Sequence, residues 1–165
     1  MNFFSPNHLL GNINKYSNFV FFFGIALLVI GFYFAFFVAP NDYQQGVMVK
    51  IMYLHVPAAW LSLGIYSSIA VMSLVYLITK TPVAALISKS LAPIGFIFTS
   101  IVLISGVFWG RPMWGVWWVW DARITSMLIL ALFYAMYLIV WRIYDKEEKV
   151  YRISTFITIL GIINV

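Results

Sequence analysis

Residues 19–39 read FVFFFGIALLVIGFYFAFFVA, a run of 21 residues without a charged side chain. A helix rises about 1.5 Å per residue, so this run reaches about 31 Å, close to the roughly 30 Å thickness of a bilayer's hydrocarbon core. The stretch is therefore expected to form a membrane-spanning helix. No small-residue cleavage pattern follows the apolar run, which favours a retained first helix over a cleaved signal peptide.

Four further apolar stretches follow along the chain. The second expected span, residues 51–78, would be about 42 Å long as a helix, so one end must protrude or the helix must tilt. The next spans are expected at residues 91–109 and 124–140, and residues 153–165 are expected to begin a fifth that is too short to cross comfortably. The sequence predicts an all-α polytopic membrane protein with at least five transmembrane helices, forming one integral membrane domain over residues 1–165.

The composition of the whole chain agrees with this class. Of its 165 residues, 64% are hydrophobic and only 9% are charged, against about 25% charged in a soluble domain. The absence of cysteine excludes thiol–disulfide chemistry, thiolate metal sites and a prosthetic group bound covalently through sulfur. The net charge of +5 is explained by cytoplasmic loops, because no basic run with interleaved aromatic residues indicates nucleic-acid binding.

Basic residues are distributed unevenly between the two sides of the expected bundle. The seven on one side are Lys15, Lys80, Lys89, Arg142, Lys146, Lys149 and Arg152. The three on the other side are Lys50, Arg111 and Arg123. Because cytoplasmic loops carry the excess of Lys and Arg, the N-terminus is expected in the cytoplasm and the connections 41–50 and 110–123 outside. His8 then lies on the cytoplasmic side, as an ordinary polar residue of the N-terminal tail.

Tryptophan is concentrated in the second outward connection. Five of the seven tryptophans fall within twelve residues: Trp109, Trp114, Trp117, Trp118 and Trp120. An aromatic belt at the membrane surface is the simplest explanation. Four residues of this segment nevertheless recur at i, i+3, i+4 and i+7, namely Trp114, Trp117, Trp118 and Asp121. A helical turn here would project three indoles and a carboxylate from one face.

Such an indole surface suits a flat, hydrophobic ligand with a polar rim. Arg111 and Arg123 could pair with carboxylates on that rim. Haem has this shape and carries two propionates, although quinones and lipids are apolar as well. Asp121 taken alone is more simply an acid at the start of a helix, where the helix dipole stabilises it.

A histidine lies near the outward end of the second expected span. Residues 53–57 read YLHVP, and Pro57 is expected to be tolerated in the first turn of the helix. His55 therefore lies near the same face as the tryptophans, and imidazole is a common axial ligand of haem iron. The alternative is an interfacial histidine with satisfied hydrogen bonds. Met48 and Met52 share its helical face and could offer a thioether, but methionine more often fills gaps in packing.

Residues 114–126, WGVWWVWDARITS, resemble the tryptophan-rich WWD signature of haem-handling membrane proteins. Among these, the chain is most similar to the CcmC family of haem-delivery proteins of system I cytochrome c maturation. FWGRP at residues 108–112, MYLHVPAAW at residues 52–60 and the order of the spans also match, so the resemblance covers essentially the whole chain. The residues expected to bind haem are His55, Arg111, Trp114, Trp117, Trp118, Trp120, Asp121 and Arg123.

The resemblance implies a function and a set of partners. Haem b would be held transiently at the outer face of the cytoplasmic membrane, with His55 as the first of two axial ligands, and passed to the haem chaperone CcmE without bond chemistry. The transporter subunits CcmA and CcmB and the small protein CcmD are the further implied partners. The family pattern has six spans and a second axial histidine after the fifth, whereas this sequence reaches Val165 within its fifth.

Two other functions fit parts of the pattern. A membrane electron carrier would hold haem b inside the bundle, but it usually needs histidines deep in facing helices, and the expected spans contain only His55, at one end. A permease or scaffold subunit would use the tryptophans only as a membrane anchor. A haem absorbance spectrum separates the scaffold from both haem-binding functions.

Overall fold

The structure, a computed structural model, describes residues 6–165, with side chains from residue 15 onward. The described chain is almost entirely helical and divides into two compact units, residues up to Asp42 and residues Tyr43–Val165. A single membrane domain spanning residues 1–165 stays a prediction.

The first unit contains one long helix. Helix α1 (Pro6–Tyr33) continues into a short π-helix, η1 (Phe34–Val38). Its apolar part, Lys15–Val38, is long and hydrophobic enough to cross a membrane, in agreement with the span expected at residues 19–39. The interpretation of the N-terminal residues as a polar tail is wrong from Pro6 onward, because proline at the first helical position is preorganised for a helix start. His8 lies in this helix, and its side chain is outside the described part.

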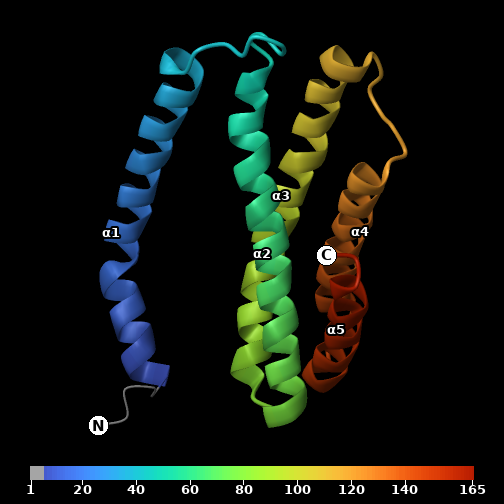
Figure 1. Cartoon of the computed structure of the whole chain (residues 1–165). Coiled ribbons are helices and arrows are strands. Elements are labelled where there is room, and N and C mark those ends of the chain that lie inside the picture. Colours follow the sequence, from blue (N-terminus) through green and yellow to red (C-terminus); the bar gives the residue numbers. More distant parts are fainter. Residues whose placement is uncertain (1–5) are drawn as a thin grey trace. The chain divides into compact units, whose positions relative to one another are not determined.

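The second unit is a bundle of four helices. They are α2 (Val49–Thr79), α3 (Pro82–Trp114), α4 (Ala122–Ile143) and α5 (Glu147–Ile162). Consecutive helices pack together and α5 also contacts α2, so the four close around one core (Figure 1). The turn between α2 and α3 is short because Lys80 adopts a left-handed backbone, φ 56°, and Pro82 starts the next helix.

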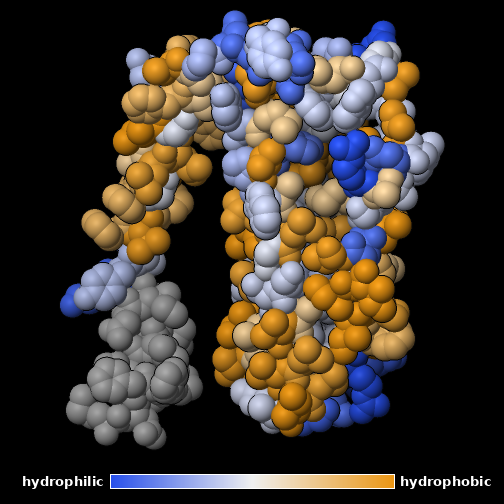
Figure 2. Space-filling model, in the orientation of Figure 1, coloured by the Kyte–Doolittle hydropathy of each residue, from blue (hydrophilic) through white to orange (hydrophobic). Residues whose placement is uncertain are grey.

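The membrane class predicted from the sequence is confirmed. In the described chain, the apolar part of α1 and the helices α2, α3 and α4 are each long and hydrophobic enough to span a bilayer. Figure 2 shows hydrophobic residues over much of the visible side of the bundle and hydrophilic residues gathered at the end where α2 begins. Helix α5 has 16 residues, fewer than the roughly 20 that a span needs.

The third helix is much longer than predicted. The apolar stretch 91–109 is its central part, and α3 extends by about two turns toward its N-terminus and one toward its C-terminus. Lys89, expected in a connection, is inside α3, where its ammonium lies 4.5 Å from the centre of the Trp141 ring. Hydropathy failed here because it marks the part of a helix that lies in hydrocarbon, while polar residues such as Ser88 and Ser90 continue the same helix beyond it.

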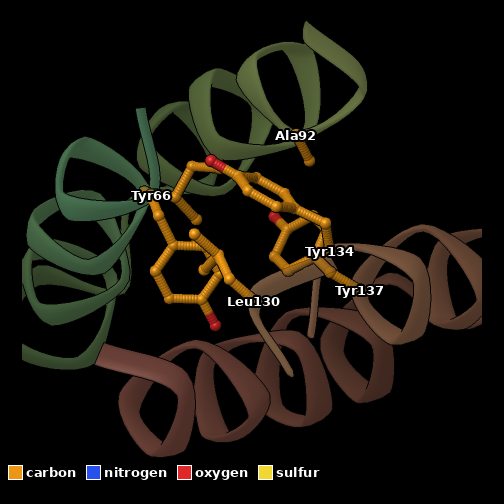
Figure 3. Packing of buried hydrophobic residues seen from close by; sticks show 6 residues of the cluster. Tyr66, Ala92, Leu130, Tyr134 and Tyr137 are labelled. Atoms are coloured by element: carbon orange, nitrogen blue, oxygen red, sulfur yellow. The ribbon is translucent and has the colours of Figure 1, made fainter. Parts of the chain in front are cut away.

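Large aromatic side chains from two helices form the core. Tyr66 of α2 and Tyr134 of α4 are fully buried, and their rings meet edge to face with centroids 5.0 Å apart (Figure 3). The Tyr134 hydroxyl donates to the Ser62 carbonyl over 2.8 Å. A Cβ atom on Gly95 of α3 would lie 2.2 Å from the Tyr134 hydroxyl, so glycine is the residue that lets this ring approach α3. Small residues of this kind let membrane helices pack closely.

The unequal helix lengths shape the end of the bundle that carries the tryptophans. Helix α2 has 31 residues and α3 has 33, whereas α4 has 22. At the opposite end, Trp141 near the end of α4 packs in one cluster with Tyr76 of α2 and Ala84 of α3, so these helices end close to one level. Helix α2 therefore extends about 14 Å beyond the start of α4, and residues 115–121 descend along the bundle to reach it (Figure 1).

Candidate functional site

Three helices bring predicted residues together at this end of the bundle. His55 is the seventh residue of α2, about 9 Å along the helix from its first residue. A cavity of about 80 Å³ lies between α2, α3 and α4. Its lining residues are His55, Val102, Leu103, Gly106, Val107, Arg123, Ile124 and Met127. The cavity thus joins His55 to Arg123, two residues that sequence reasoning selected separately.

His55 is half-buried against α3. Its Nδ1 atom lies 2.9 Å from the hydroxyl oxygen of Ser105, within hydrogen-bonding distance. A Cβ atom on the neighbouring Gly106 would be 3.2 Å from Cε1 of the ring, so the glycine makes room for the imidazole. Sequence reasoning missed Ser105 and Gly106. No local signal identifies them, because they lie about 50 residues from His55 and meet it only through helix packing.

Pro57 does not lie in the first turn of its helix, as the sequence interpretation expected. It is the ninth residue of α2 and therefore interrupts an established helix. Proline has no N–H, so the carbonyl of Tyr53 receives no hydrogen bond from position 57. Transmembrane helices tolerate such interior prolines where neighbouring groups satisfy the freed carbonyl.

The expected helical face of three indoles and Asp121 is wrong. Helix α3 ends at Trp114, where Gly115 adopts a left-handed backbone with φ 77° and its N–H bonds to the Arg111 carbonyl over 3.0 Å. The Arg111 guanidinium in turn donates to the Gly115 carbonyl. From there to Asp121 the backbone is non-helical. Glycine at this position terminates the helix because it alone adopts positive φ without steric cost.

The indoles instead form several aromatic pairs on the surface of this end. Trp114 packs edge to face on Trp109 at 5.0 Å between ring centroids, and Trp118 packs on Trp120 at 5.4 Å. Trp117 meets Phe108 of α3 at 6.1 Å. Trp114, Trp117 and Trp120 are exposed, Trp120 by 74%. The result is a broad aromatic surface assembled from the end of α3 and the segment after it.

Trp118 differs from its exposed neighbours. Its indole N–H is buried and has no hydrogen-bond partner among the residues that the structure describes. Leaving such a donor unsatisfied costs about 1–3 kcal/mol. Trp141, near the other end of the bundle, also has a buried indole N–H without a partner among the described residues, so this feature is not specific to the tryptophan-rich end.

Arginine side chains connect the aromatic surface to the cavity. Arg123 lines the cavity, bonds to the Asp121 carboxylate at 3.0 Å and lies 5.8 Å from the centre of the Trp114 ring. Arg111 lies 5.7 Å from the centre of the Trp117 ring. Guanidinium groups held in this way at an exposed edge suit carboxylates, which they bind with two parallel hydrogen bonds.

Asp121 starts helix α4. Its carboxylate accepts the Ile124 N–H over 2.9 Å, the N-cap interaction that satisfies a free amide of the first turn. This bond, together with the adjacent Arg123 guanidinium, holds the pKa of Asp121 below its ordinary value. Asp121 thus fixes the start of α4 and the direction of Arg123. The alternative that the sequence suggested, an acid at a helix start, is what the structure contains.

One further contact was not expected from the sequence. The indole N–H of Trp109 donates to Oε1 of Gln45 over 3.1 Å. This hydrogen bond joins the segment that precedes α2 to the end of α3. The two connections expected outside the membrane therefore meet at one end of the bundle. Glutamine in a short polar connection carries no pattern that would identify this role.

Comparisons with known proteins identify the family. The family model CcmC, heme exporter protein C, matches residues 1–165. The chain is 46% identical over 140 residues to heme exporter protein C of Bradyrhizobium diazoefficiens, which covers 85% of this chain and 53% of that protein. It is 43% identical over 140 residues to heme exporter protein C of Escherichia coli K12, covering 85% of this chain and 57% of that protein.

A plant relative extends the comparison. A ccmC-like mitochondrial protein of Marchantia polymorpha, whose name refers to cytochrome c biosynthesis, is 52% identical over 108 residues, 66% of this chain and 47% of that protein. The chain spans about half the length of the curated relatives it matches. With a family match along its whole length and the tryptophan-rich end assembled as described, the chain belongs to the CcmC family, heme exporter protein C.

Proposed function

We propose that this protein binds haem at the outer face of the cytoplasmic membrane and delivers it to the haem chaperone CcmE for biogenesis of c-type cytochromes. The observation that carries the proposal is the cavity in which His55 and Arg123 meet beside the aromatic surface. An iron ligand, an anion-binding group and a wide apolar surface at one place are the three features that haem requires. Relatives named heme exporter protein C support haem as the cargo.

Each type of residue at the site would contact a different part of haem. The His55 imidazole supplies an axial ligand to iron, and the exposed indoles offer apolar surface to the macrocycle. Arg111 and Arg123 pair with the propionates. Ligand pockets for molecules of drug size have about 300–1,000 Å³, so a cavity of about 80 Å³ cannot enclose a porphyrin. The macrocycle would therefore extend outside the cavity onto the indoles, where a chaperone can reach it.

Transfer of this kind needs no bond chemistry in the porphyrin. Haem b is held transiently by coordination and packing and released intact, which makes the protein a carrier and not an enzyme. In this proposal the N-terminus is cytoplasmic, the haem site is periplasmic, and CcmA, CcmB and CcmD are the neighbours in the inner membrane. The excess of basic residues on the side opposite the tryptophans supports that orientation.

Haem content of histidine variants tests the proposal. The chain has two histidines, so His55→Ala and His8→Ala form a matched pair. After purification in detergent, His55→Ala is expected to retain at least tenfold less haem than the wild type by absorbance, because it loses the iron ligand of the tryptophan-rich end. His8→Ala is expected to retain haem as the wild type does.

Other outcomes favour different functions. Equal haem content in the two variants would remove His55 from the site. A wild-type protein that inserts normally and holds no haem would instead favour a scaffold whose tryptophans only anchor it in the membrane.

A further inference from the structure

We infer that Ser105 is a positioning residue for His55: its hydroxyl oxygen accepts the Nδ1–H of the imidazole and so leaves Nε2 as the nitrogen available to iron. This inference rests on the proposed function, since it concerns the same ligand. It adds a residue of α3, outside the tryptophan-rich motif, to the machinery that holds haem.

The direction of the hydrogen bond follows from the other contacts of Ser105. Its hydroxyl oxygen lies 2.6 Å from the Ile101 carbonyl and 3.3 Å from the Val102 carbonyl. A serine hydroxyl has one proton, and a carbonyl oxygen can only accept. The shorter contact takes that proton. A lone pair of the hydroxyl oxygen then remains for Nδ1 of His55, 2.9 Å away, and Nδ1 must be the donor.

The position of the Nδ1 proton decides which ring nitrogen can bind iron. A neutral imidazole carries a proton on only one nitrogen, so a protonated Nδ1 leaves a lone pair on Nε2. Histidines that bind metals usually donate their other N–H to such an acceptor, which sets the tautomer and raises the basicity of the ligand.

Ser105 and Gly106 together define the place of the imidazole on α3. Gly106 allows the ring to approach, since a Cβ there would stand 3.2 Å from Cε1. Ser105 then accepts a hydrogen bond from Nδ1, which fixes the direction of the ring. Packing alone would leave the ring free to turn over, whereas the hydrogen bond selects one of the two orientations.

Three serine variants in the intact protein separate positioning from packing. Ser105→Ala removes the acceptor, and Ser105→Thr keeps a hydroxyl at the same place. Ser100→Ala is the control, because Ser100 is also on α3, half-buried and bonded to the carbonyl four residues earlier, at 2.8 Å. All variants are first compared with the wild type for membrane insertion and helix content.

Haem affinity and the midpoint potential of bound haem are then measured. Ser105→Ala is expected to bind haem about 10- to 100-fold more weakly, the usual effect of losing such a partner. Its midpoint potential is expected to be more positive, because a less basic imidazole stabilises ferric iron less. Ser105→Thr and Ser100→Ala are expected to match the wild type in both measurements. The potential is a property of the ligand that loss of packing alone would not reproduce.

Failure of the inference is distinguishable from failure of the proposed function. Unchanged affinity and potential in Ser105→Ala, with haem lost in His55→Ala, would overturn the positioning role and leave His55 as ligand. A Ser105→Thr variant that behaves like Ser105→Ala would also overturn it, because the hydroxyl would then not be what matters. Haem binding that survives His55→Ala would remove the ligand on which the inference rests, whereas a normally inserted wild type without haem would overturn the proposed function.

Discussion

Arg123 shows how much one side chain contributes at the residue scale. It lines the cavity of His55, bonds to Asp121 at 3.0 Å and stacks on Trp114, although 79% of its side chain is exposed. Exposed ion pairs stabilise folds little, commonly by less than about 1 kcal/mol. The value of this arrangement is geometric, since the planar guanidinium can contact a carboxylate and an aromatic ring at the same time.

Replacing Arg123 with lysine tests this geometric role. Arg123→Lys keeps the charge but loses the planar group, so haem retention is expected to fall by about fivefold, corresponding to about 1 kcal/mol for a stacked cation. Haem bound per purified protein is the measurement. Arg152→Lys is the control, because Arg152 is equally exposed and bonds to Glu148 at 3.2 Å in α5. Equal retention in both variants would show that charge alone suffices at position 123.

At the scale of one element, Gly115 decides the shape of the tryptophan-rich segment. Its positive φ ends α3 and sends residues 116–121 away from the helical path. For a residue with a Cβ atom, the left-handed backbone conformation costs about 1 kcal/mol of conformational free energy, and the cost is smaller for asparagine than for alanine. No atom lies within 4 Å of the Cβ position of Gly115, so a substitution there is disfavoured by the backbone conformation and not by a steric clash.

A pair of variants at Gly115 follows from this geometry. Gly115→Ala is expected to favour continued helix, shift the indoles and lower haem retention severalfold. Gly115→Asn is expected to lie between alanine and the wild type, because asparagine tolerates the left-handed region. Tryptophan fluorescence reports the shift of the indoles directly. The same emission spectrum and haem content in all three proteins would contradict a role for the left-handed cap.

Helix packing gives a second prediction at the element scale. A Cβ on Gly95 would collide with the buried Tyr134 hydroxyl and ring, so Gly95→Ala is expected to lower the free energy of unfolding by about 1–3 kcal/mol. Thermal unfolding in detergent, followed by circular dichroism, measures the change. Gly64→Ala in α2 is the control, since nothing lies within 4 Å of its Cβ position and alanine favours helix. A neutral Gly95→Ala would mean that Tyr134 turns aside at no cost.

For the whole molecule, the distribution of basic residues predicts the orientation in the membrane. The natural chain has no cysteine, so single cysteines report topology without background. Val116→Cys, at an exposed position of the tryptophan-rich segment, is expected to react with a membrane-impermeant maleimide in intact cells. Lys146→Cys, in the connection before α5, is expected to react only after the cells are opened. The reverse labelling pattern would invert the proposed orientation.

Much of this protein could be predicted locally. The apolar stretches located four membrane helices, because hydrophobic length is a property of consecutive residues. The tryptophan-rich segment and His55 were singled out by residue type and by their resemblance to a family to which the chain does belong. The helical face expected for Trp114, Trp117 and Trp118 was wrong, since periodicity carries no information once a glycine ends the helix.

The sequence by itself determined the membrane class, the order of the helices and the identity of the tryptophan-rich end. Only the tertiary structure decided which residues meet there. His55 faces Ser105 and shares a cavity with Arg123 because α2 packs on α3 and α3 packs on α4, so that side chains of all three helices line one cavity. The hydrophobicity of consecutive residues determines which segments span the membrane. Contacts between side chains depend instead on the packing of helices that are far apart in the chain.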